Sequence, residues 1–363
     1  MNILSNHIRK LDWGIIVPAV FLVFFGLAGI YSTSLAKNDF LNFEKQIIFF
    51  IFGFLLMILV SFSDYRLLRN NSYLILALYG ICLALLLGLY FFAPLIRGTR
   101  GWYKIGLLSL DPNEPTKIVM IILLAKYFSM RHVEMYKFRH IVFSGVYVFF
   151  PALLIFLKPD LGGTAVLLLI WIGILLISGI KIRHFLILFL CFLLVATLSW
   201  TFILRDYQKE RITSFIFPYD YLGASWSQNQ TKIAIGSGQL MGQGIGEGSQ
   251  VQYGFLPEPH TDFIFSVIAE EWGLAGVSAL FIVYGFLVWR VLLIAIRSQF
   301  NFPRLFASGF AIILISQFFI NIGMNLSLLP VVGIYLPFIS YGGSGLVGNF
   351  IALGILQSIK IRK

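Results

Sequence analysis

The sequence predicts an all-α polytopic membrane protein. Hydrophobic residues make up 59% of the 363 residues and charged residues only 12%, whereas about a quarter of the residues of a soluble domain are charged. The mean hydropathy is +0.88. Long apolar segments recur along the chain, and each approaches the ~20 residues that a helix needs to cross a bilayer. Lipid must therefore be part of the solvent of this fold.

Ten segments are predicted to cross the membrane. Because further spans follow the first segment and no small-residue cleavage pattern leads into a soluble domain, we expect a retained helix there rather than a signal peptide. The fourth to sixth segments are interrupted by Lys117, Pro151 and the turn "KPDLGG". In order, the ten segments are 13–32, 46–62, 73–94, 114–129, 141–157, 162–180, 185–204, 263–289, 305–325 and 344–360.

The distribution of basic residues predicts the orientation. If the N-terminus is cytoplasmic, sixteen Lys and Arg residues lie in the inside segments, against six in the short outside loops (Lys37, Lys45, Arg97, Arg100, Lys104 and Lys158). Lys and Arg are enriched in cytoplasmic loops. Both termini are therefore expected inside, as an even number of spans requires. The net charge of +11 has the same explanation, and no basic stripe indicates nucleic acid.

One connection is much longer than the others. Residues 205–262 join the seventh and eighth spans on the outer face, and a loop of this length in a compact domain is usually functional. Its glycine-rich part, "IGSGQLMGQGIGEGSQVQYG", leaves backbone amides accessible. We expect one transmembrane domain, residues 1–363, with its function where this loop meets the helices.

Ionisable residues at the edges of spans are candidates for function because they are costly near lipid. In "DPNEPTK", Asp111 or Asn113 is suited to cap the fourth helix, and Glu114 and Lys117 share a helical face and are able to pair. That pair is open to a purely structural interpretation. The turn "KPDLGGT" is equally open to either reading and contributes Lys158 and Asp160, while the basic loop before "DPNEPTK" contributes Arg100.

The polar cluster before the eighth span is the strongest candidate. His260, Thr261 and Asp262 gather with Glu258 beside the long loop. A helix cap at Thr261 or Asp262 is the structural alternative, worth about 1 kcal/mol, but a cap needs only one residue. Two further carboxylates follow about two turns into the span, at 270 and 271. The later run 321–345, rich in Asn, Pro and Gly, is predicted to fold back and line a cavity, because irregular backbone at membrane depth needs one.

Five ordered motifs resemble the SEDS family (shape, elongation, division and sporulation), and its RodA branch more than its FtsW branch. They are "DPNEPTK", "KPDLGGTAV", "IAIGSG", "GFLPEPHTDFIFSVIAEEWG" and "NIGMNLSLLPVVGIYLPFISYGGSGL". The chain departs from the family where Gln-Pro-Ser-Glu is usual and Asp111 to Glu114 stand here, and where "GASWSQNQ" replaces a Gly-Tyr-Gln sequence.

The resemblance implies a peptidoglycan glycosyltransferase for cell-wall elongation and rod shape, in the bacterial cytoplasmic (inner) membrane with its active site on the extracytoplasmic face. Such enzymes polymerise lipid II into β-1,4 glycan strands by inverting transfer. They work with a class B penicillin-binding protein transpeptidase and other elongation-complex proteins. The residue matching Asp262 is essential in the family, and those matching Glu114 and Lys117 are functionally sensitive.

Inverting transfer needs a base for the acceptor hydroxyl and positive charge for the leaving pyrophosphate. Asp262 is the predicted base, with His260 and Thr261 orienting it or the sugar and with Glu114 and Lys117 shaping the cavity. A divalent cation, Mg²⁺ or Mn²⁺, is compatible with this chemistry, but no residue spacing defines a metal site. The alternatives are a lipid II flippase with a proton relay at 270 and 271, and a non-catalytic scaffold. The predicted substrate-binding and pyrophosphate-binding residues are Arg211, Lys232, Arg100, Lys158, Asp160, Ser340 and Ser344.

Overall fold

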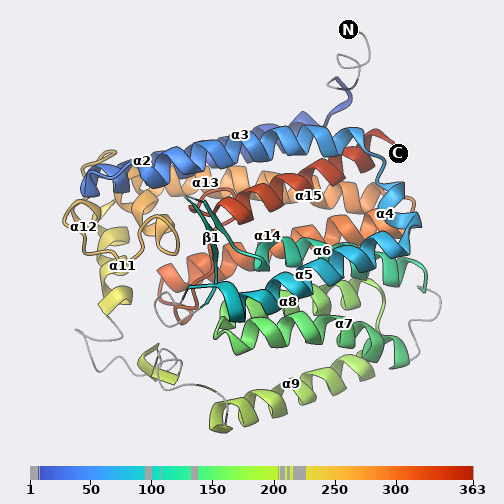
Figure 1. Ribbon diagram of the computed structural model, residues 1–363. Coiled ribbons are helices and arrows are strands. Elements are labelled where there is room, and N and C mark those ends of the chain that lie inside the picture. The colour runs from blue at the N-terminus through green and yellow to red at the C-terminus, as the bar shows by residue number, and fades with distance from the viewer. Residues whose placement is uncertain are drawn as a thin grey trace.

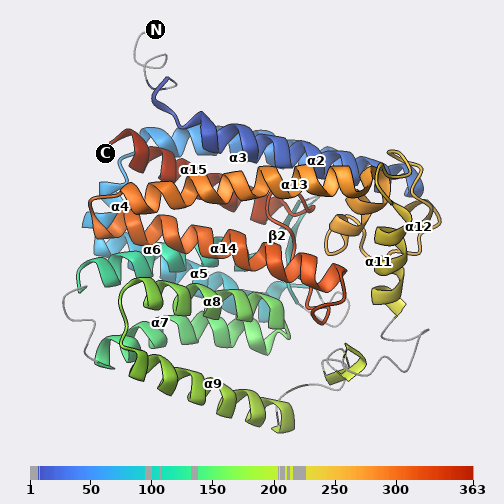
Figure 2. The ribbon, with the colours of Figure 1, turned by 180° about the vertical axis from the view of Figure 1, so that it is seen from behind.

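The computed structural model is a bundle of long helices with one small hairpin (Figures 1 and 2). It describes residues 7, 9–94, 100–106, 108–131, 138–202, 204, 209–210, 213–215 and 226–362. In that part of the chain the only sheet is an antiparallel pair in which Tyr103 lies opposite Leu110. Its strands are β1 (Tyr103–Ile105) and β2 (Leu108–Leu110).

The helices follow the predicted segments closely. Asp12, Asn71 and Asp160 begin three of them by accepting hydrogen bonds from backbone N–H groups of the first turn, which satisfies donors that a helix start leaves unpaired. The helices are α2 (Trp13–Lys37), α3 (Leu41–Phe62), α4 (Arg66–Asn70), α5 (Ser72–Phe92), α6 (Asn113–Ser129), α7 (Phe138–Leu157), α8 (Leu161–Ile177), α9 (Ile182–Phe202), α11 (Trp226–Ser237), α12 (Ser249–Gln252), α13 (Ile264–Arg297), α14 (Asn301–Asn325) and α15 (Gly343–Ile361).

Eight of these helices are long and apolar enough to cross a membrane, within the described residues. The other two predicted spans are α6 and α8, each 17 residues long. Helix α8 is apolar but short. Helix α6 carries Glu114 and Lys117, and its residues from Thr116 to Ala125 are all buried. Because its neighbours separate α6 from lipid, it does not need a fully apolar surface. The polytopic all-α class is confirmed. The predicted total of ten spans is reached when α6 and α8 are counted with the eight longer helices.

Helix α14 packs against several other helices of the bundle. Helix α13 lies between α2 and α14, α6 and α8 pack against α14, and α15 packs along α3. Large apolar side chains such as Phe306, Phe310 and Phe350 fill the space between them and are fully buried. Helix α9 lies at the edge of the bundle, and its apolar side chains are largely exposed (Figure 1).

The two ends of the bundle differ. The start of α2 and the end of α15 lie at one end, whereas the hairpin, α11 and α12 lie at the other (Figures 1 and 2). This arrangement agrees with the predicted topology, in which both termini lie opposite the long loop.

The loop after α11 joins the bundle through a break in α13. Gly273 adopts φ 62° and ψ −161°, a conformation that only glycine adopts readily. The backbone N–H groups of the next two residues donate to the carbonyls of Gln239 and Leu240 (2.9 and 3.0 Å). Carbonyls of residues 270 and 271 in turn accept from Gln243 and Gly244. The loop therefore satisfies backbone groups that the break exposes.

Candidate active site

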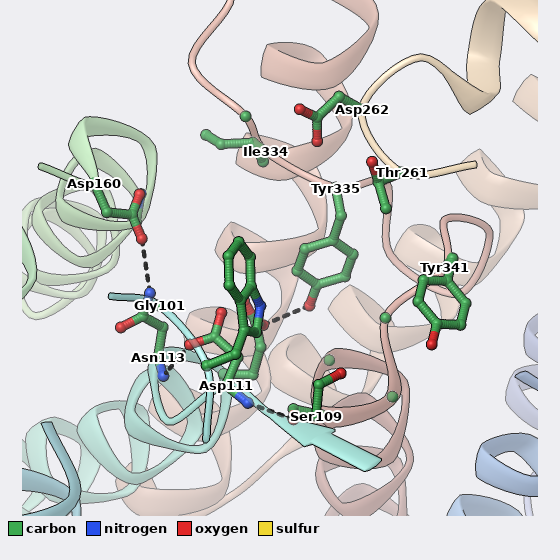
Figure 3. A pocket seen from close by; sticks show the side chains of 18 of the residues that line it. Gly101, Ser109, Asp111, Asn113, Asp160, Thr261, Asp262, Ile334, Tyr335 and Tyr341 are labelled. Carbon is green, nitrogen blue, oxygen red and sulfur yellow. Dashed lines mark hydrogen bonds between the residues drawn. The ribbon is translucent and has the colours of Figure 1, made fainter. Parts of the chain in front are cut away.

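A cavity of about 590 Å³ opens at the hairpin end of the bundle (Figure 3). Segments distant in the sequence line it: the hairpin, the start of α6, the turn before α8, the turn before α13, and the irregular run 332–345. Figure 3 shows Asp262, Thr261 and Tyr335 on one side of the view and Asp111, Asn113 and Asp160 on another. The predicted fold-back of 321–345 is thus present, and it forms a wall of the cavity.

Asp262 is held at the cavity by its backbone. The side-chain amides of Asn321 and Asn325 both donate to its carbonyl at 3.0 Å. The N-cap of α13 is Phe263, so the capping position is occupied by neither Thr261 nor Asp262. The half-buried Asp262 side chain lines the cavity. It does so beside Gly333, whose φ of +71° favours glycine and where an added Cβ would lie 3.6 Å from Oδ2 of Asp262.

The neighbours of Asp262 are tied to the run 336–341. The Ser340 hydroxyl donates to the carbonyl of Thr261 (2.7 Å), and the N–H of Tyr341 donates to the carbonyl of His260 (2.8 Å). His260 Nε2 lies 3.9 Å from Oε2 of Glu258. The turn that carries Asp262 is therefore fixed from both α14 and the segment before α15.

Glu114 and Lys117 form the predicted pair on α6. Lys117 Nζ donates to Oε1 of Glu114 at 2.6 Å, and Tyr335 donates its hydroxyl to Oε2 at 2.6 Å. The Lys117 ammonium also lies 5.2 Å from the centre of the Tyr335 ring. Lys117 is only 4% exposed, so its charge depends on these partners.

A second polar network lies at the start of α6 and α8. Lys158 Nζ donates to the side-chain oxygen of Asn113, and the Asn113 amide donates to Oδ2 of Asp160 (both 2.7 Å). Lys158 Nζ also lies 3.8 Å from Oδ1 of Asp111. The Ser344 hydroxyl accepts from the N–H of Asp111 at 2.8 Å, which joins this network to the start of α15.

The carboxyl group of Asp111 is electrostatically unusual. Its side chain is 24% exposed because it borders the cavity, but protein surrounds it on the other sides. This desolvation raises the pKa of Asp111 to about 6, aided by the nearby Glu114 and Asp160 carboxylates and opposed by the Lys158 ammonium. The cavity therefore contains a carboxyl whose charge changes near neutral pH.

The structure gathers most of the predicted site residues and separates two. The residues that line the cavity are Asp262, Thr261, His260, Glu114, Lys117, Lys158, Asp160 and Ser344, and Ser340 contacts the turn behind them. Arg100 does not line it and donates to the carbonyl of Tyr90. Lys232 is exposed on α11, also outside the cavity lining. Arg211 lies outside the described residues.

Sequence reasoning missed three contributors. It identified Asp111 and Asn113 only as helix caps. Asp111 does accept a hydrogen bond from the N–H of Asn113, the first residue of α6 (3.0 Å), but both residues also line the cavity. Their position beside Glu114 was the available signal. Tyr335 lies within the predicted re-entrant run but had no polar neighbour in sequence to mark it. Its partner is distant along the chain.

The adjacent carboxylates of Glu270 and Glu271 hold the long loop. The N–H of Gln250 donates to Glu270 Oε1 at 2.7 Å, and the Ser32 hydroxyl and the N–H of Gly246 donate to Glu271 Oε1. Neither carboxylate lines the main cavity.

The side chains at the cavity combine two chemical capacities. Carboxylates such as Asp262 are able to accept a proton, and the ammonium groups of Lys104, Lys117 and Lys158 are able to face an anion. Among the described residues no three His, Cys, Asp or Glu side chains are grouped so as to hold a metal ion.

Comparison with known proteins gives consistent relatives. The sequence model of the family named for FtsW, RodA and SpoVE, described as "Cell cycle protein", matches residues 10–363. The chain is 40% identical to the peptidoglycan glycosyltransferase MrdB of Escherichia coli K12 over 286 residues, which are 78% of this chain and 76% of that protein. It is 32% identical to the stage V sporulation protein E of Bacillus subtilis over 356 residues, 96% of each chain.

Solved structures agree with these relatives. A chain of a peptidoglycan synthase complex, described for its structural coordination of polymerization and crosslinking, superposes with a TM-score of 0.80 at 31% identity, covering 96% of this chain and 97% of that one. The rod shape determining protein RodA of Thermus thermophilus superposes with a TM-score of 0.69 at 28% identity, covering 96% of each chain.

Proposed function

The chain belongs to the SEDS family, which includes FtsW, RodA and SpoVE, and on this premise we propose that it is a peptidoglycan glycosyltransferase that polymerises lipid II with Asp262 as the general base. The observation that carries the proposal is the position of Asp262: its carboxylate lines the cavity while Asn321 and Asn325 hold its backbone carbonyl. A base must be held within reach of the proton that it removes.

The reaction is one displacement. The 4-hydroxyl oxygen of the acceptor sugar bonds to C1 of the donor sugar, and the bond from C1 to the pyrophosphate oxygen breaks. The α-linkage of lipid II thereby becomes a β-1,4 bond, and undecaprenyl pyrophosphate leaves. Asp262 takes the hydroxyl proton. His260 and Thr261 orient Asp262 or the sugar, because both adjoin it and line the same cavity.

The leaving pyrophosphate needs positive charge. Lys117 and Lys158 are the best supported of the predicted cations, because both line the cavity and are held by hydrogen bonds to the side chains of Glu114 and Asn113. Asp160 and Ser344 support this wall. Ser340 contributes by holding Thr261. Roles for Arg100, Lys232 and Arg211 in substrate binding stay predictions.

The chain is a multi-pass protein of the inner membrane. We infer that the cavity faces the extracytoplasmic side, because it lies at the end of the bundle opposite the start of α2 and the end of α15 (Figure 1) and the basic residues predict cytoplasmic termini. The likeness to a chain of a peptidoglycan synthase complex supports a penicillin-binding protein as partner. Lipid II and the growing glycan strand are the proposed ligands.

Purified protein in detergent with fluorescent lipid II tests the function, with gel electrophoresis to detect polymer. Detergent removes the bilayer, so a flippase gives no product in this assay. Wild-type protein should form polymer, and Asp262→Asn should lower the rate by about 10²- to 10⁴-fold, the usual contribution of a general base. The variant should elute and melt like the wild type. Substantial polymer from this variant would exclude Asp262 as the base.

A further inference from the structure

The hairpin of β1 and β2 presents one of its faces to the cavity. Side chains alternate between the two faces of a strand, and residues opposite each other in an antiparallel pair share a face. Lys104 pairs with Ser109 and both line the cavity, whereas the next pair, Tyr103 and Leu110, does not. The Tyr103 hydroxyl instead donates to the carbonyl of Leu85 on α5 (2.6 Å). The hairpin is therefore anchored to the bundle by one face and directs the other face, with Lys104, to the cavity.

Lys104 differs from the other two lysines of the cavity because its ammonium group has no partner. Lys117 and Lys158 are 4% and 5% exposed and donate to the side chains of Glu114 and Asn113. Part of their charge is therefore used within the protein wall. Lys104 is exposed at the cavity and forms no hydrogen bond or ion pair with any described residue. Its whole charge is available to a ligand.

Membrane orientation does not explain a lysine at this position. The basic residues that set the orientation of a membrane protein lie in its cytoplasmic loops. The hairpin lies at the opposite end of the bundle from the start of α2 and the end of α15 (Figure 1). A solvated surface charge is the simplest alternative explanation for Lys104, and it predicts that the residue has no effect on substrate binding.

The hairpin and the proposed base lie on different sides of the cavity. Figure 3 shows Ser109, the strand partner of Lys104, at the bottom of the view and Asp262 at the top. In an inverting displacement, the attacking oxygen and the leaving oxygen lie on opposite faces of the sugar at C1. Because Asp262 is proposed to hold the attacking hydroxyl, the leaving pyrophosphate is directed toward the side of the cavity that the hairpin forms.

We propose that the Lys104 ammonium binds the pyrophosphate of the donor lipid II and stabilises the charge on its leaving oxygen. This inference rests on the proposed function. An ammonium group on a flexible stem is a compact charge with three N–H donors, so it follows the phosphate as the bond to C1 breaks. Lys104 transfers no proton, since the pyrophosphate leaves as an anion and the proton of the acceptor hydroxyl goes to Asp262.

The first test is the variant Lys104→Met, which removes the charge and keeps much of the side-chain length. Initial rates of polymer formation are measured against lipid II concentration. We expect kcat/KM to fall about tenfold, the loss expected for one charge-assisted hydrogen bond at an exposed site. Lys104→Arg keeps the charge and should retain most of the rate.

The matched control is Lys37→Met. It removes the same charge from an exposed lysine at the end of α2, outside the cavity lining, and it should react like the wild type. A wild-type rate in Lys104→Met would overturn the proposal. Equal losses in Lys104→Met and Lys37→Met would overturn it as well, because they would indicate a general effect of surface charge.

The second test measures the Kd of undecaprenyl pyrophosphate for the purified protein in detergent. This ligand carries neither sugar nor peptide, so it separates the pyrophosphate from the peptide carboxylates, the other anionic groups of lipid II. Lys104→Met should bind it about tenfold more weakly than the wild type, and both proteins should bind undecaprenol, which lacks the phosphates, equally. An equal Kd for undecaprenyl pyrophosphate, or no binding by the wild type, would overturn the proposal. An equal Kd together with a reduced rate would assign Lys104 to a peptide carboxylate.

The two proposals fail in different ways. If the wild type forms no polymer from lipid II, the proposed function is wrong and this inference falls with it. If the wild type forms polymer and Lys104→Met binds undecaprenyl pyrophosphate as tightly as the wild type does, only the role of Lys104 is wrong.

Discussion

The side-chain amide of Asn321 donates to the backbone carbonyl of Asp262 at 3.0 Å and to that of Ile334 at 2.7 Å. One fully buried side chain on α14 thus joins the turn before α13 to the re-entrant run beyond α14. Both segments line the cavity. The placement of the proposed base therefore depends on a residue that contacts it only through its backbone.

Replacing Asn321 with Asp should misplace Asp262. The new carboxylate has no donor for the two carbonyls, and leaving them unsatisfied should cost about 1–3 kcal/mol each. We expect a lower melting temperature and at least a tenfold loss of kcat, measured by thermal unfolding and polymer assay. Asn301→Asp at the start of the same helix is the control, because an acidic residue is favourable there. Wild-type kinetics in Asn321→Asp would argue against this anchoring.

Tyr335→Phe should impair activity and cause a limited loss of stability. The change removes the hydroxyl that donates to Glu114 but retains the ring beside Lys117. A single neutral donor to a charged partner contributes about 1.5–3 kcal/mol, so we expect a modest shift in melting temperature and a clear fall in polymerisation rate. Tyr284→Phe removes a buried hydroxyl bonded to the carbonyl of Leu314, away from the cavity. Equal losses of activity in both variants would mean that only packing matters.

Glu114→Ala should destabilise the protein by about 3–5 kcal/mol, because it leaves the buried ammonium of Lys117 without its partner. The double variant Glu114→Gln with Lys117→Met removes both charges and should recover much of that stability. It should not recover full polymerisation, since the cavity then lacks Lys117, one of the cations proposed to face the pyrophosphate. Thermal unfolding and the polymer assay separate the two effects. Recovered activity in the double variant would show that the pair is structural only.

The raised pKa of Asp111 predicts a pH dependence of stability. Its pKa is about 6 in the fold against an ordinary 3.8, so the folded protein binds more protons than the unfolded chain between these values. The contribution of Asp111 is therefore complete below about pH 4 and is lost as pH rises through about 6. Asp111→Asn should remove this part of the slope when melting temperature is measured from pH 4 to 7. An unchanged slope in the variant would place the titration elsewhere.

Local sequence patterns predicted part of the site correctly. Glu114 and Lys117 are three residues apart, so helical geometry alone brings them to one face, and their ion pair is present at 2.6 Å. The run of Pro and Gly after α14 predicted a re-entrant wall, because such backbone needs a cavity at membrane depth.

Charge alone predicted the substrate-binding cations less well. Arg100 and Lys232 were selected as cations of an outer loop, but Arg100 contacts the carbonyl of Tyr90 and Lys232 is exposed on α11. The direction of a long side chain depends on the carbonyls and carboxylates that the fold brings near it. Asp111 shows the converse, since it accepts from the first N–H of α6, as predicted for a cap, but also borders Lys158, which its sequence position does not indicate.

The sequence by itself determined that the chain is a helical membrane protein, where most of its helices lie, and which polar motifs stand apart from lipid. These properties follow from hydropathy and spacing along one segment, so they need no knowledge of neighbours. Only the tertiary structure decided that Tyr335 bonds to Glu114 and that Asn321 anchors Asp262. Those contacts join residues on different segments, and only the packing of α6, α13 and α14 brings them within hydrogen-bonding distance.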